Sequence, residues 1–444
     1  MNAANRSALV LALSRQAVAA PSPGPPAGVA LEGPPGVIGA EWGRVNAASI
    51  KDDMRRNFIE PAAAKGLSEP DLLERGRRFV EICAEVAPHW LEEADAIAAA
   101  AGVDAEIYRA YIGCVYRSLW AGDECTSYAV SPEYTDGALF FHKNRDNVAR
   151  PQAACVVASS LPGVNRFITV SDASVLACMM MVNDKGLAGS GDTGGLAPPA
   201  PRYRGIMNTF ILRHIAERAA TCAEAEAIVR DFVGKGYYAG GATTGTHWLF
   251  TDRHGAILEI SNNASEVVAR RHTDKTYFSL RGDSAAAHTL RDAPPPIDFH
   301  TYHNVSRDPS MCFDSTISGM TVEIHPAHPE HLSCAWLTFP GKGLAFPLLM
   351  GCRTTPLPLM SGEVYALLSP IDGAAPTWEA VERNSHANKE LLAWRAAALL
   401  EDGAADRAHA LLDDWVLSTT QAQTAMLRAM QPAGVPAGPP TFKL

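Results

Sequence analysis

Apolar residues with helical spacing dominate the first third of the chain. They predict three helices, from Ser68 to Pro88, from Trp90 to Gly102 and from Ile107 to Leu119. Ser68 and Asp71 form a capping box at the start of the first helix, and a glycine ends the second. Residues 19–38, which precede these helices, are rich in Pro, Gly and Ala, and this composition predicts a flexible leader.

From Cys125 onward the apolar residues alternate, which predicts strands. Residues 126–130 and 138–142 would form a hairpin around a turn at 132–137. Further strands are expected at 153–158, 166–171, 178–182 and 187–189, and a second hairpin would join 247–251 to 256–261. Two helices are expected next, one at about 204–219 and one that starts at a capping box at Thr221. Strand and loop are expected after Asp274. Residues 378–430 are expected to be nearly all helix, with a break at Gly403. Strands in runs and helices in runs indicate the α+β class.

Composition narrows the class of protein. The net charge of the 444 residues is −10, which argues against nucleic acid or anionic membrane as a partner. Nine cysteines at irregular spacing include no Cys-x-x-Cys pair, so they fit reduced and mostly buried thiols. The apolar run from Ser7 to Ala20 is short and interrupted by Arg15, and no run reaches the roughly 20 residues of a membrane-spanning helix. We therefore expect a cytoplasmic protein.

The segment 122–127, Gly-Asp-Glu-Cys-Thr-Ser, places a cysteine where the helical region ends and a strand begins. If the chain cuts itself between Glu124 and Cys125, the cysteine gains a free α-amine next to its own thiol. That amine can take the thiol proton, because ordinary pKa values are about 8 for an α-amine and about 8.5 for a cysteine. Cys125 is therefore the candidate nucleophile, and the bond between Glu124 and Cys125 is the candidate autocleavage site.

Polar residues at the end of the paired strand are candidate partners for Cys125. The hairpin returns Asn144, Arg145 and Asp146 beside it, where a carboxylate can hold the α-ammonium and a neighbouring cation can fix that carboxylate. His142 is a rival proton acceptor, because alternation puts it on the same face as Asn144 and keeps it within reach. A polar turn on a solvated surface is the alternative interpretation of the same residues.

Several motifs follow one another in a fixed order. They are a glycine pattern at 36–43, a helical region at 85–102, Cys-Thr-Ser at 125–127, Asn-Arg-Asp at 144–146, Asn-Asp-Lys-Gly-Leu at 183–187 and a late hairpin at 251–259. In these motifs the chain resembles the isopenicillin N acyltransferase-like branch of the N-terminal-nucleophile hydrolases. The similarity runs from about Gly36 to beyond Met360, and penicillin V acylases and acid ceramidase are more distant relatives of that branch.

The resemblance implies a four-layer αββα sandwich in which Cys125 opens a central strand as nucleophile and Asp146 supports it. Residues 1–35 would be a leader, 36–124 a helical propeptide, and 125–444 the catalytic domain with its helical tail. Glu124 departs from the glycine that precedes the nucleophile in the penicillin acyltransferase, and no asparagine stands near 277–281, where the family has an oxyanion donor. Asn304 or the backbone N–H groups at 189–194 are the substitutes that the sequence offers.

These features predict a self-processing enzyme that hydrolyses an amide or transfers its acyl group to an amine, without a metal or an organic cofactor. Its partner would be a small-molecule amide or acyl donor, with coenzyme A thioesters among the donors considered. A β-lactam, bile-amide or ceramide-type substrate is an alternative for the same site. An inactive or self-processed scaffold that binds partners through the helical tail is the alternative of another class. The two fragments would remain associated, and a homo-oligomer is a further option.

Two other patterns point away from competing chemistries. His325, His328 and His331 have a spacing that could bind a metal, but Pro326 and Pro329 interrupt any helix that would present them. We interpret this run as a surface loop. The chain has no Gly-x-Ser-x-Gly motif, which argues against a serine α/β-hydrolase.

Overall fold

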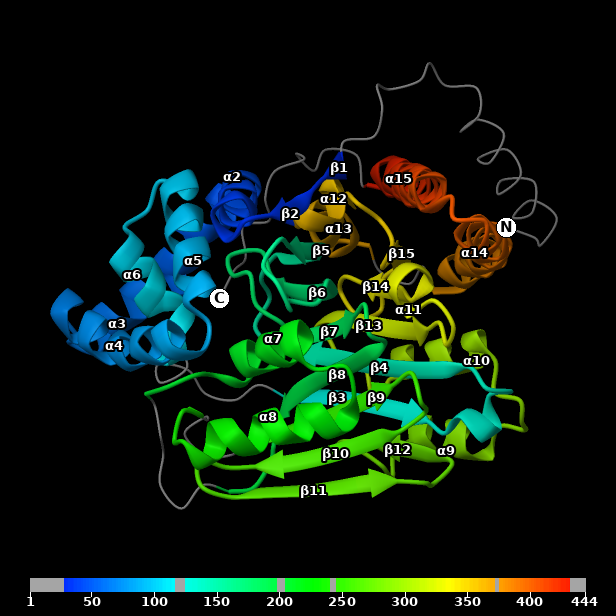
Figure 1. The fold of residues 1–444 in the computed structure, drawn as a ribbon, viewed down its shortest axis with the longest axis horizontal. Helices are drawn as coiled ribbons and strands as arrows, with labels where there is room; N and C mark the ends of the chain where they lie inside the picture. Colours follow the sequence, from blue (N-terminus) through cyan, green and yellow to red (C-terminus); the bar gives the residue numbers. More distant parts are fainter. Residues whose placement is uncertain (1–27, 116–123, 198–203, 240–244, 372–374, 432–444) are drawn as a thin grey trace.

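The strands assemble mainly into two sheets (Figure 1). The computed structural model describes residues 28–115, 124–197, 204–239, 245–371 and 375–431. The eight-stranded sheet has the order β11 (Val267–His272), β10 (Ile257–Asn262), β9 (Thr246–Asp252), β8 (Leu187–Thr193), β7 (Met180–Asn183), β6 (Phe167–Asp172), β5 (Gln152–Ser159), β2 (Leu31–Gly33). The six-stranded sheet has the order β12 (Thr276–Phe278), β3 (Glu124–Val130), β4 (Leu139–Asp146), β13 (Thr316–Ile324), β14 (Cys334–Thr338), β15 (Ala345–Leu349). A small third sheet pairs β1 (Gly28–Val29) with β16 (Thr355–Pro356).

The two large sheets pack against each other through one face each. Along β5, Ala154 and Val156 belong to the hydrophobic core that also contains the six-stranded sheet. The intervening Ala153, Cys155 and Val157 belong to a second core, shared with helices. This split follows from the two-residue period of a strand, which sends neighbouring side chains to opposite faces. The eight-stranded sheet therefore separates two apolar layers.

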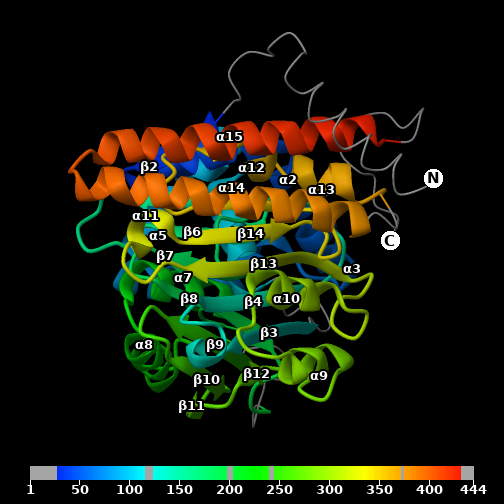
Figure 2. The same ribbon diagram turned by 90° about the vertical axis from the view of Figure 1, so that its right-hand side faces the viewer.

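Helices cover the outer faces of both sheets. The longer ones before β3 and beside the eight-stranded sheet are α2 (Pro35–Met54), α4 (Glu69–Val86), α5 (Pro88–Ala101), α6 (Ala105–Ala110), α7 (Asn208–Arg218) and α8 (Cys222–Gly234). Those beside the six-stranded sheet are α9 (Ala285–Asp292), α10 (Phe299–Asn304), α14 (Ala375–Glu401) and α15 (Ala405–Ala429). Shorter turns are the π segments η1 (Arg55–Ile59) and η2 (Tyr111–Val115), α3 (Glu60–Ala64), the 3₁₀ turns η4 (Pro132–Tyr134) and η5 (Val305–Arg307), α11 (Pro329–Leu332), α12 (Leu357–Met360) and α13 (Glu363–Leu368). Figure 2 shows α14 and α15 lying side by side across one end of the molecule.

Close backbone packing fixes the first helix against α5. A Cβ added at Gly39 would lie 2.3 Å from the carbonyl oxygen of Glu93, and one at Gly43 would lie 2.5 Å from that of Ile97. Only glycine permits this approach. The glycine pattern at 36–43 is therefore a helix–helix contact in this structure.

Three expectations about the elements were wrong. The leader does not extend to residue 35, because β1 and β2 occupy residues 28–33 and bury Val29 and Leu31. The helix α2 lies where a leader and a glycine motif were expected, since its apolar face is buried against α5. The region after Asp274 contains α9 and α10, whose N-caps Ser284 and Asp298 accept hydrogen bonds from the first helical turn.

Other expectations were confirmed. The hairpin that starts at Cys125, the capping boxes at Ser68 and Thr221, the left-handed cap at Gly102 and the break at Gly403 are all present. The cysteines whose side chains are described are buried free thiols; Cys114 lies outside those described side chains. No helix among the described residues is both long and apolar enough to cross a bilayer.

Candidate active site

Cys125 is the second residue of β3, the strand next to the edge of the six-stranded sheet. In the antiparallel pair with β4, Cys125 is opposite Arg145, and Glu124 is opposite Asp146. The Cys125 side chain is buried, with 4% of its surface exposed. The β3–β4 hairpin therefore places Arg145 directly opposite the candidate nucleophile, and Asp146 one position further along.

The face of β3 that carries Cys125 points toward the eight-stranded sheet. Residues at spacing two share a face, and so do directly opposed residues, so Cys125 lies on the side of Ser127, Lys143 and Arg145. The Ser127 hydroxyl donates to Asp192 of β8 at 2.8 Å, and the Lys143 ammonium lies 3.1 Å from the same carboxylate. The thiol therefore faces the space between the sheets, which contains these charged groups.

Arg145 is held in a buried ion cluster beneath Cys125. Its Nη1 lies 2.5 Å from Oδ1 of Asp172 and 3.1 Å from Oε1 of Gln152. Arg150 lies 3.4 Å from the same aspartate and 4.0 Å from Asp53 of α2. Burial raises the pKa of Asp172, but the guanidinium groups of Arg145 and Arg150 outweigh it and lower that pKa to about 2. The aspartate is therefore ionised when the protein is folded, and it neutralises Arg145.

The low pKa of Asp172 predicts an acid-sensitive contribution to stability. The folded pKa of about 2 lies below the value of about 3.9 expected in the unfolded chain, so the contribution is complete above pH 4 and is lost as the pH falls through 2. It amounts to about 2 kcal/mol near neutral pH. Urea unfolding between pH 7 and pH 2 should show Asp172→Asn to be less stable than the wild type at pH 7, with the difference narrowing in acid. A difference that is the same at every pH would contradict this account.

Two of the expected partners point away from Cys125. Asn144 lies on the other face of β4, where its amide donates to the backbone oxygens of Ser306 at 2.7 Å and Met311 at 3.2 Å. His142 shares that face, lies 2.9 Å from Asn144 and 2.7 Å from Thr321, and burial lowers its pKa to about 3. The expectation that His142 could reach the thiol was wrong, because alternation gives the Cys125 face to Lys143 and Arg145.

Asp146 also lies on that other face, and it is level with the start of β3. Its backbone pairs with Glu124, so it lies beside the peptide bond that joins Glu124 to Cys125. The Thr316 hydroxyl donates to Asp146 Oδ1, and Arg281 Nη2 lies 3.9 Å from Oδ2. The Asp146 side chain is therefore on the opposite side of the sheet from the Cys125 thiol.

Arg281 was not anticipated from the sequence. The expectation was that Arg145 would be the cation that fixes Asp146, but Arg145 pairs with Asp172 on the inner face and Arg281 approaches Asp146 instead. The segment 277–281 was the one sequence signal that could have indicated Arg281, because an oxyanion donor was expected there and the segment ends in this arginine. Sequence spacing could not show that this segment runs beside β3.

Neither proposed substitute for an oxyanion donor is well placed. Asn304 ends α10, and that helix packs on the face of the sheet opposite to Cys125, where the Tyr128 and Tyr302 hydroxyls each donate to the other's backbone oxygen, at 2.9 and 2.7 Å. The stretch 189–194 is mostly strand β8, whose backbone pairs with β7 and β9. Its N–H groups therefore take part in the sheet.

One cluster within the described residues has the composition of a metal site. Glu323, His386 and Glu390 place ligand atoms within 4.8 Å of one another. Lys389 lies among them, with Nζ 3.0 Å from Glu323 and in contact with Glu390. Its ammonium already supplies the positive charge that these carboxylates require. The three histidines at 325–331 lie in the connection between β13 and β14, and His331 belongs to the short helix α11.

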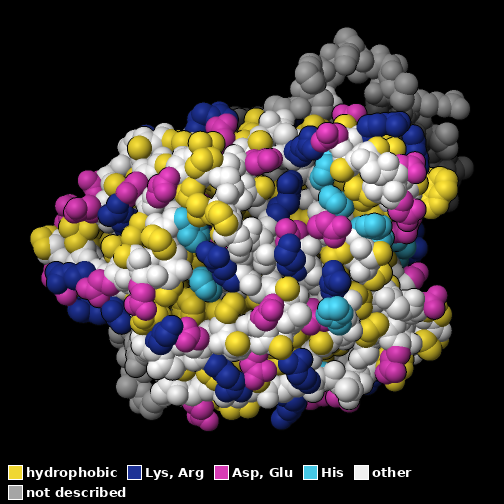
Figure 3. Space-filling model, in the orientation of Figure 1, with side chains coloured by type: hydrophobic (Ala, Val, Ile, Leu, Met, Phe, Trp, Pro, Cys, Tyr) yellow, Lys and Arg dark blue, Asp and Glu magenta, His cyan; other side chains and the backbone are white. Residues whose placement is uncertain are grey.

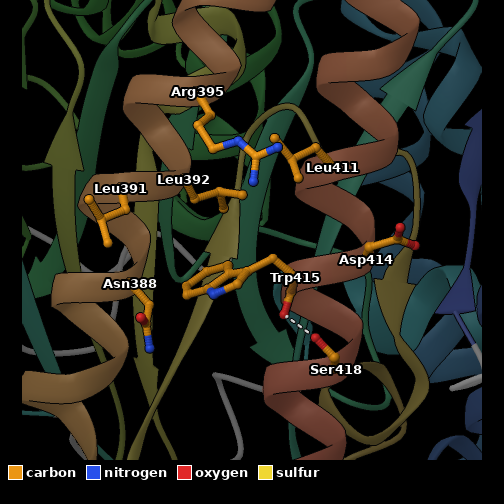
Figure 4. A pocket seen from close by; sticks show the side chains of 8 residues that line it. All are labelled: Asn388, Leu391, Leu392, Arg395, Leu411, Asp414, Trp415 and Ser418. Atoms are coloured by element: carbon orange, nitrogen blue, oxygen red, sulfur yellow. Dashed lines mark hydrogen bonds between the residues drawn. The ribbon is translucent and has the colours of Figure 1, made fainter.

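A groove between α14 and α15 lies at the opposite end of the six-stranded sheet from Cys125. Its volume is about 440 Å³, and Figure 4 shows Leu392, Leu411 and Trp415 converging from the two helices. Trp394 is 74% exposed, whereas Leu399, Leu411 and Trp415 are partly buried and pack against the core. On the face shown in Figure 3, basic and acidic side chains are interspersed.

Comparisons with known proteins point to a distant structural likeness. No family model matches the chain, and no curated protein matches its sequence. Penicillin V acylase from Agrobacterium tumefaciens superposes with a TM-score of 0.37 and 13% identity over 51% of this chain and 86% of that one. Conjugated bile acid hydrolase from Clostridium perfringens gives 0.37 and 11% over 51% and 92%. An N-acylethanolamine-hydrolyzing acid amidase ortholog from Caenorhabditis elegans gives 0.33 and 14% over 44% and 92%. Each of these superpositions covers between 44% and 51% of this chain.

Proposed function

We propose that this chain is a self-processing cysteine amidohydrolase or N-acyltransferase whose nucleophile is Cys125. One observation carries the proposal: the register of β3 and β4 sets Asp146 opposite the residue before Cys125. A carboxylate at that position suits an N-terminal cysteine, because it can hold the α-ammonium that appears when the preceding bond breaks. In this proposal the two stacked sheets and their flanking helices form an αββα N-terminal-nucleophile sandwich.

Processing would begin at the bond between Glu124 and Cys125. The Cys125 sulfur attacks the Glu124 carbonyl carbon, the C–N bond breaks, and the thiol proton passes to the departing nitrogen. The resulting thioester is hydrolysed by water, which leaves a carboxylate on Glu124 and a free thiol and amine on Cys125.

Turnover would use the same two groups. The α-amine accepts the thiol proton while the sulfur attacks the amide carbonyl of the substrate. The proton then passes to the leaving amine, and an acyl thioester remains on Cys125. Water or an acceptor amine releases the acyl group and regenerates the thiol. β-Lactam, bile-amide and ceramide-type amides remain alternative substrates, and an acyl-coenzyme A remains an alternative donor.

The fragments on either side of the cut would stay together. Arg213 of α7 lies 2.5 Å from Glu93 of α5, and His89 lies 2.9 Å from Glu217. These four side chains are buried, and removing one partner of a buried ion pair such as Arg213–Glu93 typically costs about 3–5 kcal/mol. The strand β2 also pairs in parallel with β5. A cut before Cys125 breaks none of these contacts.

Selective alkylation tests the proposal against a non-enzymatic scaffold. Burial raises the pKa of the other described thiols, for example Cys178 to about 12 and Cys312 to about 11, so they should react slowly. Brief treatment of the native protein with iodoacetamide, followed by peptide mass spectrometry, should modify Cys125 first. Alkylation should also stop activity against a panel of N-acyl p-nitroanilides. Equal, slow labelling of every described cysteine would favour the scaffold.

A further inference from the structure

Arg281 has a backbone conformation that side chains other than glycine rarely adopt. Its φ is +63°, and among the described residues the other non-glycine position with positive φ is Asp136. A left-handed backbone is unfavourable for a residue with a Cβ, because the Cβ approaches the following carbonyl oxygen. Asp136 lies in the exposed turn of the β3–β4 hairpin, where such conformations are ordinary. Arg281 lies instead in the turn between β12 and α9, next to the candidate active site.

The position of Arg281 follows from the edge of the six-stranded sheet. The strand β12 pairs with β3, and the Ser279 N–H donates to the Ser127 backbone oxygen at 2.8 Å. Arg281 comes two residues later, level with the start of β3. Its guanidinium lies 3.9 Å from Asp146, which ends β4 on the other side of β3. Arg281 and Asp146 therefore meet at the end of β3, where Glu124 joins Cys125.

A third element supports both members of this pair. The guanidinium carbon of Arg281 lies 4.2 Å from the centre of the Phe313 ring, a cation–π distance. The Phe313 N–H donates to the Thr316 hydroxyl oxygen at 2.9 Å, and that hydroxyl donates to Asp146. Phe313 and Thr316 thus connect Arg281 to Asp146 by a second route, in addition to the direct approach of the two side chains. The Arg281 side chain remains 25% exposed.

We propose that Arg281 is a positioning residue that orients Asp146 and offsets its charge beside the α-amine of Cys125. This inference rests on the proposed function. A carboxylate alone beside the amine would favour the ammonium form, which cannot accept the thiol proton. A guanidinium next to that carboxylate reduces this effect, so the amine is neutral and competent at lower pH.

Other charges around the amine are already balanced. They are Lys143 with Asp192, Arg145 and Arg150 with Asp172, and Asp53 near Arg150. The new carboxylate of Glu124 would be a further negative charge after processing. None of these groups is altered in the variants described below. A difference in pH dependence between a variant and the wild type therefore reports the substituted residue.

The first experiment measures turnover of an N-acyl p-nitroanilide, and iodoacetamide alkylation of Cys125, as functions of pH. Arg281→Gln should move the rising step of both profiles to higher pH by about one unit, because a positive charge near the amine is lost. Arg281→Lys should shift it less, since the charge is kept but the planar fork is lost. A merely structural residue would change the rate without moving the step.

The second experiment separates backbone strain from chemistry. Arg281→Gly removes the unfavourable φ, so its melting temperature should equal or exceed that of the wild type, while processing slows by about tenfold or more. Asp136→Gly is the matched control, which should gain similar stability and process normally. Guanidinium ion at millimolar concentration should restore part of the rate of Arg281→Gly and leave that of Asp136→Gly unchanged.

Normal processing and an unmoved pH step in Arg281→Gln and Arg281→Gly would overturn this inference and make Arg281 a turn residue that leads into α9. The proposed function would survive that result if Cys125→Ala were still uncut and inactive. Activity retained by Cys125→Ala would instead remove the proposed function itself, so the two failures are distinguishable.

Discussion

Cys125→Ala is expected to give one uncut chain without activity. The substitution removes the only atom that, in the proposed mechanism, bonds to the Glu124 carbonyl and to the substrate carbonyl, so neither processing nor turnover has a route. The residue is buried in β3, and replacing its CH2–SH side chain by a methyl group leaves the strand pairing with Arg145 intact. Intact mass under denaturing conditions and turnover of the p-nitroanilide panel measure the two effects together.

The matched control is Cys83→Ala. This thiol is also buried, lies in α4, and burial raises its pKa, so its loss should leave both processing and turnover in place. Two fragments from the wild type, with the larger one beginning at Cys125, would complete the expected pattern. A wild-type protein that is fully active as a single uncut 47.4 kDa chain would exclude autoproteolysis.

Asp146→Asn should slow processing and turnover by at least about 10²-fold while changing the melting temperature little. The amide keeps the size of the side chain and can still accept the Thr316 hydrogen bond. It cannot supply the negative charge that stabilises the α-ammonium formed when the amine takes the thiol proton. The expected signature is therefore a large kinetic loss in a protein that folds normally.

Asp314→Asn is the control for removing a carboxylate nearby. Asp314 is fully exposed, lies two residues before Thr316 and pairs with Lys342 on the surface, so its loss should affect neither rate. Single-turnover processing and thermal unfolding should be compared for both variants. Asp146→Asn with wild-type rates would assign Asp146 to a polar structural turn, the alternative interpretation of the hairpin end.

Local chemistry determined much of the secondary structure. Alternation of apolar residues after Cys125 predicted the β3–β4 hairpin, and the hairpin alone brought residues 144–146 back beside the cysteine. Capping boxes at Ser68 and Thr221 and the glycine at 403 marked helix ends correctly, because these signals act within a single turn of the chain. The same local reasoning missed α2, whose apolar stripe is interrupted by the glycines that pack against α5.

Which face of the hairpin becomes the inner one is a tertiary decision. Cys125, Lys143 and Arg145 could have faced either side, and only the eight-stranded sheet, with Asp172 and Asp192, selects theirs. His142 and Asn144 were candidates by spacing, but the β3–β4 register puts them on the face opposite to Cys125 whichever side is inner, since a strand sends neighbouring side chains to opposite faces.

Tertiary structure alone also joined Arg281 to Asp146. These residues are separated by 135 positions, and no local pattern links them. They meet because β12 pairs with one edge of β3 while β4 pairs with the other, which brings both strand ends to the same point. The sequence by itself determined a cysteine at the start of a strand and a carboxylate at the returning end of the same hairpin. Pairing between distant strands decided which cation accompanies that carboxylate, because contacts between strands depend on sheet order and not on distance along the chain.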